Sequence, residues 1–130
     1  MIKIESLDHF VLTVKSIEKS LKFYCHVLGM QEINFGENRK AVAFGKQKIN
    51  FHESRTEFEP KAAKPTPGSA NLCFIATLSI KEIILWFKEQ NIPLVEGPVE
   101  RTGAKGKILS IYIRDPDNNL IKISNYTQAN

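Results

Sequence analysis

The feature that most constrains this chain is one order of predicted elements, a strand, a helix and then three strands, that occurs twice. The two sets occupy residues 5–53 and 69–126 of the 130-residue sequence and are joined by a linker at 54–68. A βαβββ unit alone cannot cover both faces of its sheet, so two such modules are expected to pair. The sequence therefore predicts an α+β fold in which two modules form a curved mixed sheet with a central groove, where a small ligand would bind.

The elements of the first module follow from its apolar pattern and its turn residues. Leu7–Val14 is β-rich and predicts a buried strand. Ser16 offers an N-cap to a helix that runs to about Val27, and Gly29 ends it as a C′ residue. Three strands with hairpin connections are expected after this helix, at Gln31–Phe35, Lys40–Phe44 and Lys48–His52.

The second module repeats this pattern less regularly. Ser79 and Glu82 form a capping box that opens a helix. The segment from Gly97 to Gly106 is expected to be a loop whose glycines permit close approach of a ligand and lid motion. Strands are expected around these elements, at Ala70–Ala76, Pro93–Val95, Ile108–Ile113 and Leu120–Ser124.

Composition excludes several classes of protein. Hydrophobic residues make up 42% of the chain and charged residues 25%, which is typical of one globular domain spanning residues 1–130. No apolar run approaches the roughly 18 residues of a membrane span, and the first residues do not resemble a secretion leader, so a cytoplasmic protein is expected. Cys25 and Cys73 are too few for a disulfide framework and are predicted to be buried thiols. The net charge of +4 is spread among acidic residues, so no nucleic-acid partner is expected.

Three segments, Leu7–Val14, Lys22–Gly29 and Asp115–Ile121, resemble in their order and spacing the vicinal oxygen chelate superfamily. That superfamily includes glyoxalase I, extradiol dioxygenases and fosfomycin-resistance proteins. Further segments resemble its subgroup of glyoxalase domain-containing protein 5 and the virulence-associated bacterial relatives of that group. These are residues 38–41, 48–53, 57–61 and 97–104.

The resemblance implies a divalent metal that chelates two neighbouring oxygens of a substrate. Its ligands would come from the first and last strands of each module. Carried over, the resemblance assigns His9 and Asn50 to the first module, with His52 on the same strand face as Asn50, and Asn71 to the second. Candidate metals are Zn, Ni, Fe and Mn. The remaining position holds Lys122 in place of a glutamate, and an ammonium has no lone pair for a cation.

Two functions therefore stay open at this point. The first is a lactoylglutathione lyase-like or dioxygenase-like enzyme that uses metal on a small oxygenated, anionic substrate, with Glu100 moving a proton and Arg39 or Arg101 holding the anion. The alternative is a non-catalytic member that has lost its metal and binds a small anion with Lys122, Asn71 and the arginines. Relatives of this size commonly pair two chains, so a homodimer is also expected.

Overall fold

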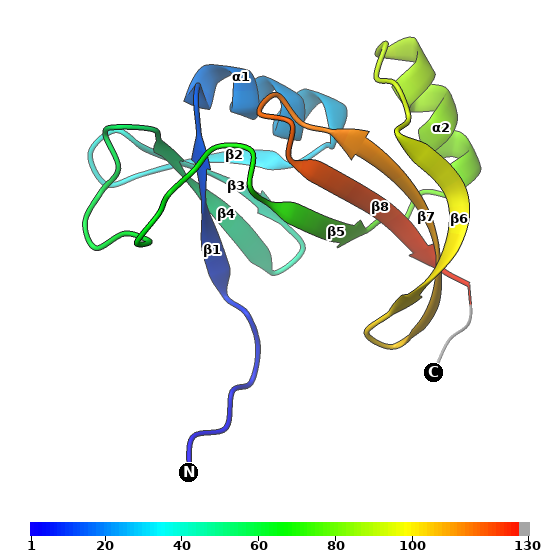
Figure 1. Cartoon of the computed structure of the whole chain (residues 1–130), viewed down its shortest axis with the longest axis horizontal. Helices are drawn as coiled ribbons and strands as arrows, with labels where there is room; N and C mark the ends of the chain where they lie inside the picture. Colours follow the sequence, from blue (N-terminus) through cyan, green and yellow to red (C-terminus); the bar gives the residue numbers. More distant parts are fainter. Residues whose placement is uncertain (128–130) are drawn as a thin grey trace. The chain divides into compact units, whose positions relative to one another are not determined.

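The computed structural model describes residues 1–127, which contain the βαβββ order twice (Figure 1). The chain divides into two compact units, one of residues 1–67 and the other starting at Gly68. Each unit holds one four-stranded mixed sheet and one helical segment, which confirms the predicted α+β class and the paired βαβββ modules. Among the described strands, the hydrogen-bonded ladders form two separate sheets of four.

The sheet of the first unit has the order β1-β4-β3-β2, with β1 parallel to β4 and the other pairs antiparallel. Its strands are β1 (His9–Val14), β2 (Gln31–Phe35), β3 (Arg39–Phe44) and β4 (Gln47–Glu53). The side chains of Val14, Ile49 and Phe51 alternate onto one face and are buried there. Tyr24 packs on this face with its ring 5.8 Å from that of Phe51, so this is the face that the helix covers.

The helix of the first unit changes its winding halfway along. Ser16 caps α1 (Ile17–Leu21) by accepting from the backbone N–H of Lys19 at 3.2 Å, as the sequence predicts. The segment η1 (Lys22–Val27) then continues to the predicted end as a π-helix. The wider turn is seen in the backbone bond from Leu28 to Phe23, five residues back, at 3.2 Å.

The second unit repeats the topology as β5-β8-β7-β6, with β5 parallel to β8. Its elements are β5 (Asn71–Ile75), α2 (Ile80–Glu89), β6 (Glu96–Gly103), β7 (Gly106–Arg114) and β8 (Leu120–Tyr126). The predicted Ser79 cap is present, since its hydroxyl accepts from the backbone N–H of Glu82 at 3.2 Å. Asn125 on β8 accepts from the N–H of Ile80 at 2.7 Å, which places the odd-numbered side of β8 toward α2.

The structure corrects the prediction for residues 93–106. Pro93–Val95 is not a strand, and most of the predicted mobile loop is the strand β6, which continues through a tight turn into β7. Pro98 and the neighbouring Gly97 weaken the strand signal in the sequence. The sheet tolerates them because β6 is an edge strand with an irregular register between Glu96 and Val99.

The structure also bears on the two cysteines and on membrane-spanning segments. Cys73 is exposed and Cys25 partly exposed, which corrects the prediction of two buried thiols, and both are free. Within residues 1–127, no helix combines the length and apolar character needed to cross a bilayer.

The Asp115–Asn119 turn is held by hydrogen bonds around two buried polar side chains, Asp115 and Asn119. The Asp115 carboxylate accepts from the backbone N–H groups of Asp117 and Asn119, both at 2.9 Å, and from the Asn119 side chain at 2.8 Å. Asn119 in turn accepts from the backbone N–H of Ala70 at 2.8 Å, just before β5. The motif that resembles the superfamily therefore has a structural role here, because it ties the start of β5 to the start of β8.

Asn119→Ala should lower the free energy of unfolding by about 2–4 kcal/mol, because it removes two side-chain hydrogen bonds, one to the Asp115 carboxylate and one from the backbone N–H of Ala70. Asn118→Gly is the matched control, since Asn118 is exposed with φ 66°, which glycine adopts readily. The control should change stability by less than about 0.5 kcal/mol in urea denaturation. Equal losses in the two variants would contradict the assigned role of Asn119.

Candidate functional site

A row of four side chains crosses the sheet of the first unit on the face opposite α1. Thr13 on β1 is opposite His52 on β4. Lys40 on β3 is opposite Phe51 on β4. Because these strands are antiparallel, the next residues, Arg39 and His52, are opposite each other. Phe35 on β2 is opposite Arg39 and completes the row. Each strand of this sheet therefore contributes one side chain.

Arg39 is held on three sides. Its guanidinium carbon lies 5.0 Å from the ring centre of Phe35 and 4.2 Å from that of Phe58, a cation–π arrangement on both rings. Its Nη2 is 3.4 Å from Nε2 of His52. Within residues 1–127, Arg39 has no carboxylate partner, and its Nε is buried without a hydrogen bond. The charge of this side chain is therefore left without a counter-ion by the described part of the chain.

His52 is a buried, neutral imidazole in this arrangement. It is only 3% exposed, and this desolvation lowers its pKa, with a further lowering from the Arg39 charge and an opposing effect from Glu57. An arginine N–H can only donate, so the contact with Arg39 assigns the lone pair to Nε2 and the proton to Nδ1. The structure gives this Nδ1 no hydrogen-bond partner in the described residues.

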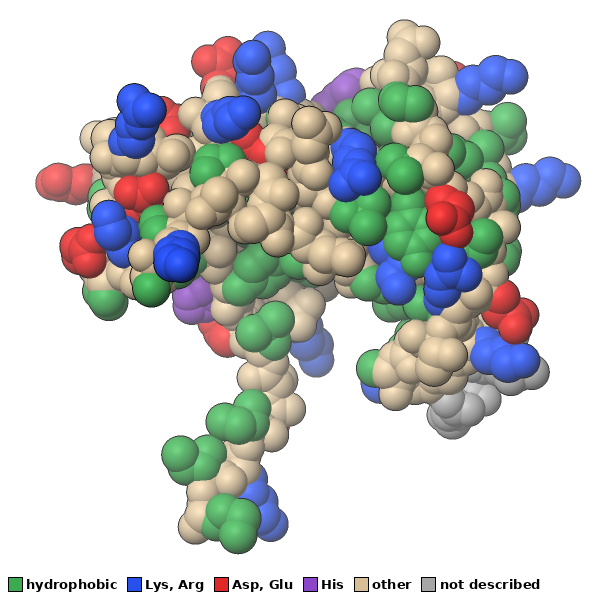
Figure 2. All heavy atoms as spheres, in the orientation of Figure 1, with side chains coloured by type: hydrophobic (Ala, Val, Ile, Leu, Met, Phe, Trp, Pro, Cys, Tyr) green, Lys and Arg blue, Asp and Glu red, His purple; other side chains and the backbone are tan. Residues whose placement is uncertain are grey.

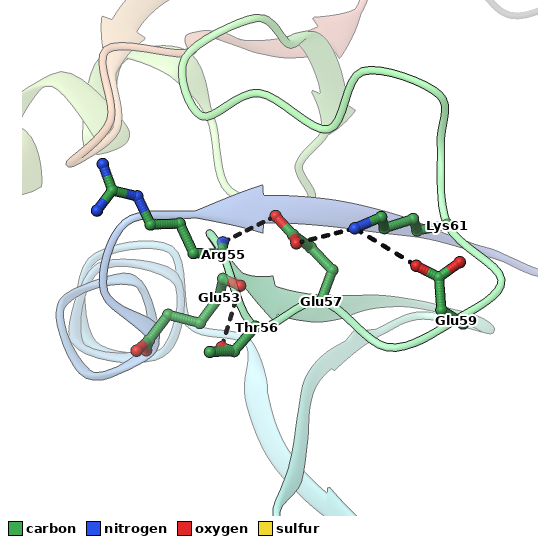
Figure 3. A network of polar contacts seen from close by, with 6 residues as sticks. All are labelled: Glu53, Arg55, Thr56, Glu57, Glu59 and Lys61. Carbon is green, nitrogen blue, oxygen red and sulfur yellow. Dashed lines mark hydrogen bonds and ion pairs between the residues drawn. The ribbon is translucent and has the colours of Figure 1, made fainter.

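The segment after β4 covers part of this face, although the sequence predicts it as a linker. Figure 3 shows its polar network, in which the backbone N–H of Arg55 donates to Glu57 at 3.0 Å and lowers the pKa of that carboxyl. Lys61 lies between Glu59 at 3.4 Å and Glu57 at 3.5 Å, and these contacts raise its pKa. Two carboxylates thus neutralise Lys61, in contrast to Arg39.

A pocket of about 210 Å³ lies between the sheet and this segment. Its walls combine an imidazole, a hydroxyl and an ammonium with apolar groups. They are Val11, Thr13 and His52 from the sheet and Pro60, Lys61, Ala62 and Pro65 from the segment. Phe58 contacts His52 edge-on at 5.5 Å, so it links the pocket wall to Arg39.

The three metal ligands assigned to the first unit share this face but do not form one compact donor set. His9 is opposite Lys48, and His52 lies four residues further along β4. The two histidines are therefore about 13 Å apart along the strand direction. Zinc–nitrogen bonds are roughly 2 Å long, so an ion at one imidazole is far from the other. Nε2 of His52 is also occupied by the Arg39 cation.

His9 and Asn50 are diagonal neighbours with features of their own. Nδ1 of His9 is 2.7 Å from the Asp8 carboxylate, a contact that commonly orients metal-binding histidines. The Asn50 side-chain oxygen is buried without a hydrogen-bond partner in the described residues. One imidazole and one amide nevertheless make a poor transition-metal site. Residues 1–127 contain no group of three or more His, Cys, Asp or Glu side chains placed to hold a metal ion, so these donors do not fit the metal that the resemblance implies.

In the second unit, the predicted ligand-binding residues lie on the face of the sheet away from α2. Lys122 is opposite Cys73 on one side and Tyr112 on the other, with its ammonium 5.7 Å from the Tyr112 ring centre. Asn71 is exposed on the same face, two residues before Cys73. Arg101 donates to the Tyr112 hydroxyl at 3.1 Å and pairs with Glu96 at 2.7 Å. Lys122 therefore does point to the side of the sheet that the helix leaves open.

Glu100, predicted to move a proton, is on the opposite face from Arg101, because successive residues of a strand alternate. Its side chain is 63% exposed and pairs with Lys107 at 3.4 Å. The structure therefore does not bring Glu100 to the same face as Lys122 and Arg101.

The sequence interpretation did not identify Thr13, Phe35, Glu57 or Phe58 as site residues. Thr13 and Phe35 join the row only through the strand register, which the sequence does not reveal. Phe58 carried a usable signal, since it is the one aromatic residue in a charged, proline-bearing segment. A single large apolar side chain in such a segment indicates that the segment packs against something.

Comparison with known proteins places these observations in a family. Virulence protein STM3117 of Salmonella typhimurium is 56% identical over 123 residues, which cover 95% of this chain and 85% of that protein. Glyoxalase domain-containing protein RDO1 of Mycosarcoma maydis is 52% identical over 128 residues, which cover 98% of this chain and 72% of that protein. The crystal structure of STM3117 matches this fold with a TM-score of 0.95 at 55% identity, covering 97% of this chain and 100% of that one.

The model of one family spans nearly the whole chain. It is described as the Glyoxalase/Bleomycin resistance protein/Dioxygenase superfamily and matches residues 6–123, a range that includes both sheets and the row on the first of them. The chain therefore belongs to the glyoxalase/bleomycin resistance/dioxygenase superfamily, as a close homologue of STM3117 and RDO1.

Proposed function

We propose that this protein binds a small organic anion in the pocket beside His52, with Arg39 as the cation that selects it. The observation that carries the proposal is the half-buried guanidinium of Arg39, which has no carboxylate partner in residues 1–127. A charge away from bulk water is costly unless it is paired, and guanidinium groups favour carboxylate and phosphate oxygens. A bound anion would supply the missing counter-ion.

The pocket offers donors for such an anion. The Nδ1 proton of His52, the Thr13 hydroxyl and the Lys61 ammonium all belong to residues that line it. Arg39 does not line the pocket, but its Nη2 is 3.4 Å from Nε2 of His52, so its charge acts on the ligand through this imidazole. Val11 and the two prolines add apolar walls, and the volume of about 210 Å³ is below the roughly 300–1,000 Å³ of sites for drug-sized ligands. The ligand class is therefore a small molecule with one anionic end.

This proposal does not require a metal. Members of the superfamily often bind metals, but the donors present here do not fit one. We derive binding, rather than a metal-assisted reaction, from the residues of the first unit. Lys122 and Arg101 belong to the second unit and do not line this pocket, so the proposal does not use them.

Arg39→Gln should weaken binding of acetate and benzoate about 10- to 100-fold, because the positive charge that acts on the anion through His52 is lost. Ligand-observed NMR titration measures this loss. Arg55→Gln is the matched control, since it removes the same charge from an exposed side chain next to the pocket segment, and it should change the dissociation constants less than twofold. Arg39→Lys should retain part of the affinity. If Arg39→Gln folds and binds both anions as the natural protein does, the proposal is wrong.

The lowered pKa of His52 predicts a pH dependence of stability. The unfolded imidazole has a pKa of about 6.5 and the folded one a lower value, so the unfolded state binds the proton first as the pH falls. Stability should therefore be full above about pH 6.5 and decrease as the pH falls from there toward the lower folded pKa. His52→Gln should remove this part of the decrease in urea denaturation between pH 7.5 and 5, whereas His26→Gln at an exposed position should not. The same pH slope in all three proteins would contradict a buried neutral His52.

Protein purified without metal-affinity resin should contain far less than one Zn, Ni, Fe or Mn per chain. The physical reason is the donor set, in which the two imidazoles are far apart and one of them receives the Arg39 cation. Elemental analysis before and after supplementation measures this, with His9→Ala and His52→Ala alongside. Stoichiometric metal that disappears in either variant would favour the metal-dependent enzyme instead.

A further inference from the structure

The first eight residues form an extended arm before β1. Figure 1 shows this arm leaving the sheet of the first unit, and Figure 2 shows hydrophobic side chains along it. Ile2 is 81% exposed and Ile4 84% exposed. Single exposed apolar residues are common on protein surfaces, but these two lie close together on one short segment. The described part of the chain gives residues 1–6 no hydrogen bond or ion pair, and the contact of Gln47 with the Leu7 carbonyl at 3.3 Å marks where the arm joins the unit.

The sequence of the arm alternates like a strand. Apolar Ile2 and Ile4 lie on one face of an extended chain, while Lys3 and Glu5 lie on the other. This pattern is typical of a β-strand. In the described part of the chain, the backbone N–H and C=O groups of residues 1–6 make no hydrogen bond, so they can pair with another strand.

We propose that the arm pairs with the same arm of a second copy of this chain, as an antiparallel two-stranded ribbon with its two-fold axis at Ile4. In this register Ile4 is opposite Ile4 of the second copy, and Lys3 is opposite Glu5 in both directions. The two copies therefore form two Lys–Glu pairs on one face and an apolar contact on the other, each favourable across an antiparallel pair. The same surface meets itself, as a closed dimer requires.

Charge complementarity selects this register over its neighbours. A shift of two residues one way places Lys3 opposite Lys3, and a shift the other way places Glu5 opposite Glu5. A shift of one residue sets charged side chains against isoleucines. Within residues 1–6, only the two-fold axis at Ile4 pairs opposite charges and apolar groups together, and Leu7 and Asp8 already contact Gln47 and His9 of their own chain. The arm sequence therefore fits a second copy of itself.

Disulfide formation between single cysteines tests the register directly, in a Cys25→Ser/Cys73→Ser background. Directly opposite residues of an antiparallel pair have Cα atoms roughly 4.5–5.5 Å apart, which a disulfide can span. Ile4→Cys should therefore cross-link at least tenfold faster than Ile2→Cys or Ser6→Cys alone. An equal mixture of the last two should cross-link about half as fast as Ile4→Cys, because about half of its dimers contain one chain of each variant. Equal rates for all three single variants would overturn the proposal.

A charge swap in the Ile4→Cys protein gives the second arm of the test. Lys3→Glu should slow its cross-linking about tenfold, because two attractive pairs become repulsive. The double variant Lys3→Glu/Glu5→Lys should restore the rate, because the pairs reform with their signs exchanged. A double variant no faster than Lys3→Glu would overturn the register. The substituted side chains of the arm are exposed, and neither they nor the two cysteines belong to the pocket, so the result is independent of whether the anion proposal holds.

Discussion

The candidate site depends on the register between β4 and its two neighbours. Strand residues alternate between two faces, and in the first unit one face is taken by the helix. A slip of one residue in β4 would move Phe51 out of the core and His52 into it. The buried contacts of Phe51 with Tyr24 therefore fix where His52, Thr13 and Arg39 meet on the other face.

The same register explains how an unpaired cation is tolerated. Arg39 is at the end of its strand pair, where Phe35 from β2 and Phe58 from the covering segment present their rings. Cation–π contacts and the hydrogen bond to a neutral imidazole offset part of the loss of water but supply no full negative charge. The result is a positively charged and preorganised position next to a small pocket. Such a position is suited to an anion that arrives from solvent.

Much of the fold could be predicted from the sequence, and much of the site could not. The strands β2, β3 and β4 were predicted to within one residue because Gly36 and Gly45, both with φ 53°, mark their hairpins clearly. β6 was missed because Pro98 argues against a strand unless its place at a sheet edge is known. Alternation along one strand predicts a shared face for Asn50 and His52, whereas His9 was assigned by the resemblance and joins that face through the register between β1 and β4. Their distances along the sheet, and the fold-back of residues 54–67, depend on tertiary contacts that a linear pattern does not contain.

Binding of an anion beside His52 under the charge of Arg39 is tested most directly by NMR of the His52 ring nitrogens and the Arg39 side-chain N–H groups during an acetate titration. These signals should shift together and saturably, and Nδ1 of His52 should be protonated and Nε2 unprotonated at neutral pH before acetate is added. Signals of His52 and Arg39 that stay unchanged while acetate binds elsewhere, or a proton on Nε2, would contradict it.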